Sequence, residues 1–256
     1  MTNNRSSTVE TDSIAREILE GKGYAIVPNL LSAQQAREAR SRVLQLAQTD
    51  RQAGRIHPDS GRERIYGLIY AGEIFETMIQ HPVVLQVVET LLGREAVLGG
   101  FSAHILHHRA SSMGIHVDYP YWAMEPPFPP DPTLEVQAIW LVEDFTEDNG
   151  APVFAPGTQT LWTAPDPDKF ARIAEKVTGS AGSVVLSHGL CWHDTSVNAT
   201  ETPRVSILAN YTPKFVQSLE DLNYRGDRAV VDRATPQLKH LLRHAWKAGD
   251  RPMFEL

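Results

Sequence analysis

The stretch MGIHVDY, residues 113–119, decides how the rest of the chain is interpreted, because it places His116 and Asp118 two positions apart. Side chains alternate along extended backbone with a period of two, so we expect a strand here that presents both side chains on one face. A histidine and a carboxylate on one face, joined by a second histidine from elsewhere, form the facial triad that holds Fe(II) and leaves coordination positions open. A His-x-Asp triple also arises by chance, so the interpretation depends on residues further along the chain.

Candidates for a third metal ligand and for an anion-binding residue lie further along the chain. His193 lies in the stretch WHDTSVN, residues 192–198, and Arg204 comes after ten intervening residues. His188 also stands near the end of an expected strand, so either histidine can supply the ligand; the spacing to Arg204 favours His193. The open positions suit a bidentate 2-oxo acid and dioxygen, and the far carboxylate of that acid needs a permanently charged partner such as Arg204.

Composition narrows the class of protein. The 256 residues are 42% hydrophobic and 21% charged, which is typical of a globular protein with one well-buried core, and we expect a single domain over residues 1–256. The net charge of −7, with arginines scattered along the chain, argues against a nucleic acid or an acidic membrane as partner.

The single cysteine, Cys191, excludes an intramolecular disulfide and fits a reducing cytoplasm. No stretch has the apolar length that a membrane span requires. Residues 1–10 are polar and lack the apolar centre of a signal peptide, so we expect a short disordered lead and a cytoplasmic protein.

The first hundred residues predict mainly helices. Their periodicity indicates helices over residues 11–22, from Ser32 to about Thr49, and over 74–79 and 83–92. Residues 24–27 read as a short strand and 51–64 as a loop. Near the end of the chain, residues 236–248 predict one more helix.

From residue 97 onward, short apolar runs alternate with turn residues, which is typical of an antiparallel sandwich or barrel. These runs are residues 103–108, 115–119, 136–142, 152–154, 183–186 and 205–211. Residues 124–132 are too rich in proline for a central strand, so we expect a stiff loop that walls a pocket, with substrate entering beside residues 125–131.

Several segments together resemble the phytanoyl-CoA dioxygenase-like branch of the Fe(II)/2-oxoglutarate oxygenases. They are HVDYPYW at 116–122, DNGAPVFAPGT at 148–158, GSVVLSHG at 182–189, His193 with Arg204, and, in the helical region, HPVVL at 81–85 with LLG at 91–93. The resemblance covers most of the chain. It implies a double-stranded β-helix, a jelly-roll or cupin-like core that is mainly β, with flanking helices and a helical N-terminal region.

The resemblance also implies roles for individual residues. His116, Asp118 and His193 would bind iron, Arg204 would bind a carboxylate of 2-oxoglutarate, and Thr195 would add a hydroxyl donor to that carboxylate. The chain departs from the family at Thr158-Gln159, where Ser-His is common. We expect this change to alter a loop and not the metal site.

Substrate contacts are harder to predict, because every candidate could also be an ordinary core side chain. Aromatic residues near the proposed metal and a histidine with pocket-facing parity are the candidates: Trp122, Phe128, Tyr119, Trp140 and His104.

The predicted function is an oxygenase that couples use of 2-oxoglutarate and dioxygen to oxidation of a small organic metabolite. Hydroxylation, oxidative cyclisation or epimerisation in secondary metabolism are the expected reactions. The alternative is a non-redox cupin-like module, a sensor or an isomerase, which has no need of Arg204 and Thr195 as a carboxylate clamp. Halogenation is disfavoured by Asp118, because that chemistry leaves the carboxylate position to a halide.

Overall fold

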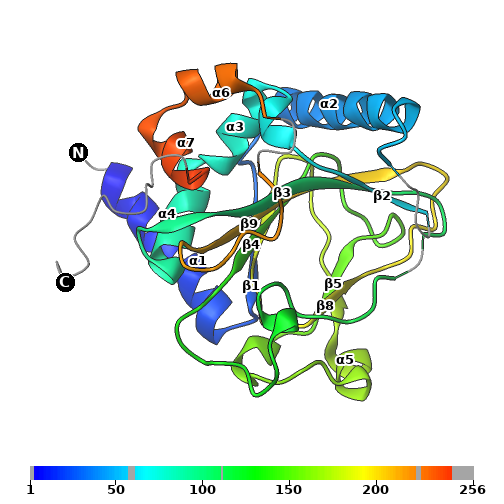
Figure 1. Ribbon diagram of the computed structural model, residues 1–256. Helices are drawn as coiled ribbons and strands as arrows, with labels where there is room; N and C mark the ends of the chain where they lie inside the picture. The colour runs from blue at the N-terminus through cyan, green and yellow to red at the C-terminus, as the bar shows by residue number, and fades with distance from the viewer. Residues whose placement is uncertain (1–2, 57–60, 111, 223–225, 244–256) are drawn as a thin grey trace.

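The computed structural model describes residues 3–56, 61–110, 112–222 and 226–243, and its centre is two facing antiparallel β-sheets (Figure 1). The large sheet has the order β1(Tyr24–Val27), β7(Val184–His188), β4(Val136–Leu141), β9(Arg204–Pro213), β3(Ala96–Leu106) and β2(Arg62–Ile65). The small sheet has the order β6(Glu175–Lys176), β5(Pro152–Phe154) and β8(His193–Thr195). This arrangement is the jelly-roll, the double-stranded β-helix that the sequence predicts.

Helices cover one face of the large sheet, and the small sheet lies on its other side (Figure 1). The α-helices are α1(Asn3–Glu20), α2(Ala33–Gln52), α3(Glu73–Ile79), α4(Pro82–Leu92), α5(Pro167–Ile173), α6(Arg228–Arg233) and α7(Pro236–Leu241). Three 3-10 turns are η1(Leu68–Tyr70), η2(Tyr121–Ala123) and η3(Thr158–Thr160). No helix among the described residues is long and apolar enough to cross a membrane.

Alternation along β4 explains how one strand serves both layers. Val136, Ala138 and Trp140 belong to the core under the helices, whereas Gln137 and Ile139 line the cavity between the sheets. Trp140 is fully buried with its ring 5.8 Å from that of His81, the N-cap of α4. The prediction that Trp140 contacts substrate is therefore wrong, because its parity on the strand points it away from the cavity.

Four local predictions differ from the structure. Residues 3–10, expected to be disordered, are the first half of α1. The expected loop at 51–64 contains the edge strand β2, whose backbone pairs with β3. Residues 115–119 form no strand; their only ladder contact is a bridge at His116. The expected helix at 236–248 is α7, which ends at Leu241, and residues 244–248 lie outside the described part of the chain.

The unusual pair Thr158-Gln159 joins the N-terminal helix to the β core. The Gln159 amide donates to the carbonyls of Leu19 and Gly21 at 3.3 and 3.1 Å, at the end of α1. The Thr158 hydroxyl accepts from the Trp192 N–H at 2.9 Å and donates to the Ala155 carbonyl. These contacts fix a loop and the approach to β8, and neither residue lines the cavity between the sheets.

Candidate metal centre

A backbone bridge holds His116 and His193 side by side. Each residue donates its N–H to the carbonyl of the other at 3.0 Å, which makes them a hydrogen-bonded antiparallel pair. Directly opposite residues in such a pair project from the same face, and their ring centroids lie 4.2 Å apart. Phe154 of β5, paired with His193 on its other side, stacks on the His193 ring at 5.2 Å.

Asp118 is positioned by the turn that follows β7. Its N–H donates to the Gly189 carbonyl at 2.8 Å, and its Oδ2 accepts from Gln137 Nε2 at 3.2 Å. A Cβ on Gly189 would lie 2.6 Å from Glu135 Oε2, so only glycine allows the chain to pass this close. His116 and Asp118 thus share a face without a regular strand, through separate backbone contacts with two different segments.

Backbone carbonyls select the tautomer of both histidines. His116 Nδ1 lies 2.7 Å from the Gly114 carbonyl, and His193 Nδ1 lies 2.9 Å from the Cys191 carbonyl. Because a carbonyl only accepts, each Nδ1 carries the hydrogen and each Nε2 keeps a free lone pair. Burial lowers the pKa of His193, outweighing the nearby Asp118 carboxylate, and keeps the ring neutral as a metal ligand must be.

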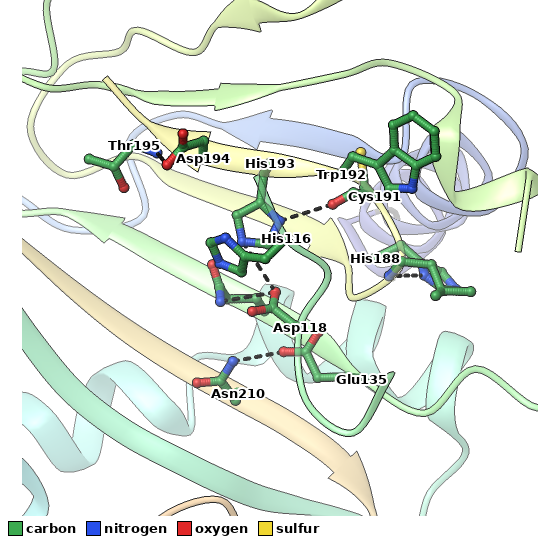
Figure 2. Close-up of polar contacts among 12 residues, drawn as sticks. His116, Asp118, Glu135, His188, Cys191, Trp192, His193, Asp194, Thr195 and Asn210 are labelled. Carbon is green, nitrogen blue, oxygen red and sulfur yellow. Dashed lines mark hydrogen bonds and ion pairs between the residues drawn. The ribbon is translucent and has the colours of Figure 1, made fainter. Parts of the chain in front are cut away.

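The three side chains point toward one another, as Figure 2 shows, and their ligand atoms lie within 4.8 Å of each other. His193 Nε2 and Asp118 Oδ2 are 3.7 Å apart, a separation that one ion with bonds of roughly 2 Å can span. Two imidazoles and one carboxylate on one side are the donor set of a non-haem Fe(II) site with open positions. The residues present therefore fit the ion that the sequence predicts.

His188, the alternative ligand, makes its hydrogen bonds outside the cluster of His116, Asp118 and His193. Its Nδ1 accepts from the Leu190 N–H at 3.0 Å, and Nε2 lies 3.3 Å from the Thr133 hydroxyl. Burial lowers its pKa to about 4, so the ring is neutral. Figure 2 places it apart from the three clustered side chains.

Cys191 is buried with its thiol against backbone carbonyls, and burial raises its pKa to about 12.

A cavity between the sheets connects the triad to Arg204. The Arg204 guanidinium is buried, donates to the Gly150 carbonyl and lies 4.5 Å from the centre of the Phe145 ring. Burial lowers its pKa to about 10, which still leaves it charged at neutral pH. Within the described residues no carboxylate is hydrogen bonded to it, and its Nε has no partner. A buried cation of this kind calls for an anion.

Four other predicted site residues line the same cavity: Thr195, Tyr119, Trp122 and His104. Trp122 is 57% exposed, and its ring lies 5.6 Å from that of Tyr119. His104 stands on β3 opposite Ser206 of β9, and burial, followed by the neighbouring arginines, lowers its pKa far enough to keep it neutral.

Phe128 does not reach the cavity. It is 4% exposed and packs edge-on against Tyr121, with the ring centroids 6.0 Å apart. Its backbone N–H donates a hydrogen bond to the Trp162 carbonyl. No residue of the proline-rich segment 124–132 lines the cavity. The predicted contact of Phe128 with substrate is wrong, because this loop folds back over its own apolar cluster instead of bordering the pocket.

The structure adds polar residues that the sequence reasoning missed. Arg62 and Arg64 reach the cavity from β2, and Asn210 and Gln137 from β9 and β4. Glu135 lies beneath Asp118, fully buried, and accepts from Asn210 Nδ2 at 2.8 Å (Figure 2). Burial, reinforced by repulsion from Asp118, raises its pKa well above the usual range. The alternation of polar residues along β9, at Arg204, Ser206 and Asn210, could have signalled this polar face.

Comparison with known proteins agrees with this geometry. Residues 19–206 match the phytanoyl-CoA dioxygenase (PhyH) family. A protein of Aspergillus fumigatus named dioxygenase af480 is 27% identical over 239 residues, covering 89% of this chain and 75% of its own length. The crystal structure of SnoN, a non-haem α-ketoglutarate-dependent epimerase from nogalamycin biosynthesis, matches with a TM-score of 0.64 and 19% identity, covering 80% of this chain and 83% of its own. SnoN in complex with Fe3+, α-ketoglutarate and nogalamycin RO matches with a TM-score of 0.65 and 17% identity, over 89% and 91% of the two chains.

The chain belongs to the phytanoyl-CoA dioxygenase family. It is an enzyme, a non-haem oxygenase that depends on Fe(II) and 2-oxoglutarate, as its sequence motifs predict.

Proposed function

We propose that His116, Asp118 and His193 hold the iron, that Arg204 and Thr195 hold 2-oxoglutarate, and that the enzyme oxidises a small organic metabolite. One observation carries the proposal: the three ligand atoms and a buried guanidinium without a carboxylate partner line one cavity. When bound, iron and 2-oxoglutarate would supply oxidation of the substrate by dioxygen, coupled to conversion of 2-oxoglutarate to succinate and carbon dioxide.

Arg204 orients the cosubstrate in this proposal. Its planar fork can receive a carboxylate through two parallel hydrogen bonds, and the Gly150 carbonyl and the Phe145 ring fix the direction of the fork. Thr195, two residues after His193 on β8, lines the cavity and can donate its hydroxyl to the same carboxylate.

Substrate binds beside these groups, against Trp122, Tyr119 and His104. Trp122 is a large exposed apolar side chain at the cavity, which favours contact with a ligand over a role in the core. The apolar side chains Ile139, Leu208 and Phe145 limit the access of water to the rest of the lining.

For the reaction, we propose hydroxylation or an oxidative cyclisation or epimerisation in secondary metabolism, carried out by one domain in the cytoplasm. The likeness to an epimerase of nogalamycin biosynthesis and to a fungal dioxygenase supports the reaction class. The presence of only one cysteine, Cys191, is consistent with a reducing compartment.

Two other functions on this scaffold are less well supported. A non-redox sensor or isomerase gives no reason to bury Arg204 without a carboxylate partner. A halogenase would leave the Asp118 position to a halide, and here the carboxylate is present and held by Gln137.

Anaerobic titration tests the proposal. Fe(II) should bind once per chain, 2-oxoglutarate should bind only after the metal, and the pair should give the charge-transfer colour of a chelated 2-oxo acid. Succinate release, screened over candidate metabolites, then identifies the substrate. A chain that binds iron but never 2-oxoglutarate would refute the roles of Arg204 and Thr195, and a chlorinated product would refute the reaction.

A further inference from the structure

Two arginines enter the cavity from the edge of the large sheet. Arg62 and Arg64 are alternate residues of β2, so both side chains lie on the same face of the strand and line the cavity. In the register of the sheet, Arg62 stands opposite Leu106 and Arg64 opposite His104. Arg204 stands opposite Leu106 on its other side, so cationic side chains of β2 and β9 flank β3 at this end of the sheet.

The two arginines of β2 differ in their partners. Arg64 donates to Glu220 at 2.8 Å and to the Ser102 hydroxyl at 3.1 Å, and it lies over the Tyr66 ring. Arg62 has no ion pair or hydrogen bond from its guanidinium to any described residue, although its Nη1 is buried. A buried guanidinium nitrogen without an acceptor is costly in free energy, so Nη1 is a favourable position for an anionic group of a ligand.

His104 supplies a second unpartnered donor at the same place. Its Nε2 is buried and has no hydrogen-bond partner among the described residues. The ring lies among Arg62, Arg64 and Arg204, which all disfavour its protonation. A neutral imidazole can still donate one N–H to an anion bound beside Arg62.

The cofactors do not balance the charge on Arg62. Fe(II) and Arg204 together contribute as much positive charge as Asp118 and doubly ionised 2-oxoglutarate contribute negative charge, and Arg64 is balanced by Glu220. The other carboxylate of the lining is Asp194 on the small sheet. It accepts from the N–H groups of Met113 and Thr195 and from the Ser112 hydroxyl, and no ion pair joins it to Arg62.

We propose that Arg62 and His104 form a subsite for a carboxylate of the substrate, and that the substrate is a small organic acid with one such group near an apolar body. The inference rests on the proposed function, in which Arg204 is taken by 2-oxoglutarate. Arg62 is the lining arginine that neither an ion pair with a described residue nor 2-oxoglutarate would neutralise, and it therefore favours a monoanion. The remaining lining is mostly apolar and receives the body of the acid; it includes Met113, Trp122, Ile139, Leu208 and Leu219.

Benzoate and benzamide are a matched pair of probes, because they share shape and apolar surface and differ in charge. Calorimetric titration into the anaerobic Fe(II)- and 2-oxoglutarate-loaded protein should give binding of benzoate about tenfold to a hundredfold tighter than of benzamide, the range of a charge-assisted pair. Arg62→Gln should remove that preference, and Arg62→Lys should restore part of it. Arg172→Gln, on the exposed surface of α5, is the matched control and should change nothing.

Three outcomes would overturn the subsite. Equal binding of the two probes to the wild type would show that no anion is selected. An unchanged preference in Arg62→Gln would place the anion elsewhere. Displacement of 2-oxoglutarate by benzoate, seen as loss of the charge-transfer band, would assign Arg62 to the cosubstrate.

The test is separate from the test of the proposed function. In Arg204→Gln, 2-oxoglutarate binding should be lost while the preference for benzoate persists. If no variant, nor the wild type, binds 2-oxoglutarate, the proposed function fails, and the benzoate preference in Arg204→Gln, where no guanidinium remains at that position, still reports on Arg62. Thermal unfolding of each variant confirms that folding is intact, which the partly exposed position of Arg62 on an edge strand favours.

Discussion

His116 and His193, 77 positions apart in sequence, bond to each other through their backbones in both directions at 3.0 Å. The bridge aligns their rings, and the carbonyls of Gly114 and Cys191 orient both Nε2 atoms. Backbone contacts therefore hold both rings in an orientation that suits a shared metal ion.

Loss of His193 should abolish tight binding of iron. Removing a hydrogen-bond partner of a metal ligand already costs about 10- to 100-fold in affinity, so His193→Ala should cost more. His188→Asn is the control, because asparagine can still accept from the Leu190 N–H and the ring is remote from the triad. Titration with Fe(II) under nitrogen measures both. Tight binding in His193→Ala with loss in His188→Asn would reverse the assignment.

Arg204→Ala should raise the requirement for 2-oxoglutarate by about two orders of magnitude or more. Removing one partner of a buried charge pair costs on the order of 3–5 kcal/mol, and each 1.4 kcal/mol is tenfold. Arg204→Lys should recover only part of the affinity, because an ammonium group cannot reproduce the fork. The concentration of 2-oxoglutarate at half-saturation is the measurement, and an unchanged value in Arg204→Ala rules out the role.

His188 should make the metal-free protein less stable in mild acid. Its folded pKa of about 4 lies below the ordinary 6.5, so its contribution to stability is complete above pH 6.5 and is lost as the pH falls toward 4. Between pH 7.5 and 5 the loss amounts to about 2 kcal/mol. Urea unfolding should show a smaller acid loss in His188→Asn, by about that amount. Parallel losses in the two proteins would mean that His188 is protonated in the folded state.

Trp122→Ala should impair coupling to substrate without loss of stability, whereas Phe128→Ala should lower the stability of the fold. Trp122 is exposed at the cavity, so its loss should weaken coupling of succinate formation to substrate with the melting temperature nearly unchanged. Phe128 is buried against Tyr121, so its loss should cost about 3–5 kcal/mol of stability. Differential scanning calorimetry beside a coupling assay separates the two. A destabilised Trp122→Ala with normal coupling would place substrate elsewhere.

The sequence predicted the parts of the site that depend on short-range spacing. The motif of the site consists of residues that are close in sequence, such as His116 and Asp118, or that have the spacing of the family, such as His193 and Arg204. The fold and the cofactor class that this motif implied are confirmed. The spacing to Arg204 favoured His193 over His188, although both follow the same apolar strand. Only the pairing of Phe154 and His116 with His193 places one of them at the cavity.

The wrong predictions concern residues whose positions depend on contacts between segments far apart in sequence. Arg62 and Arg64 looked like part of a polar loop, because an edge strand of four residues carries almost no pattern until β3 pairs with it. Phe128 was predicted at the pocket because its loop follows the ligands closely, and Trp140 was included as another large aromatic side chain. Strand parity decides where Trp140 points, and a folded-back loop decides where Phe128 points. Glu135 gave no signal, since its environment is created by Gly189 and Asn210.

The segment that bears His116 and Asp118 has almost no secondary structure of its own. An ion bound there would therefore link two parts of the chain that lie far apart in sequence. Closing such a long loop is costly in chain entropy, and a ligand that binds only the closed form adds its binding energy to folding, about 4 kcal/mol at a thousandfold excess over Kd. Iron supply would then set how long the protein survives proteases as well as how fast it works.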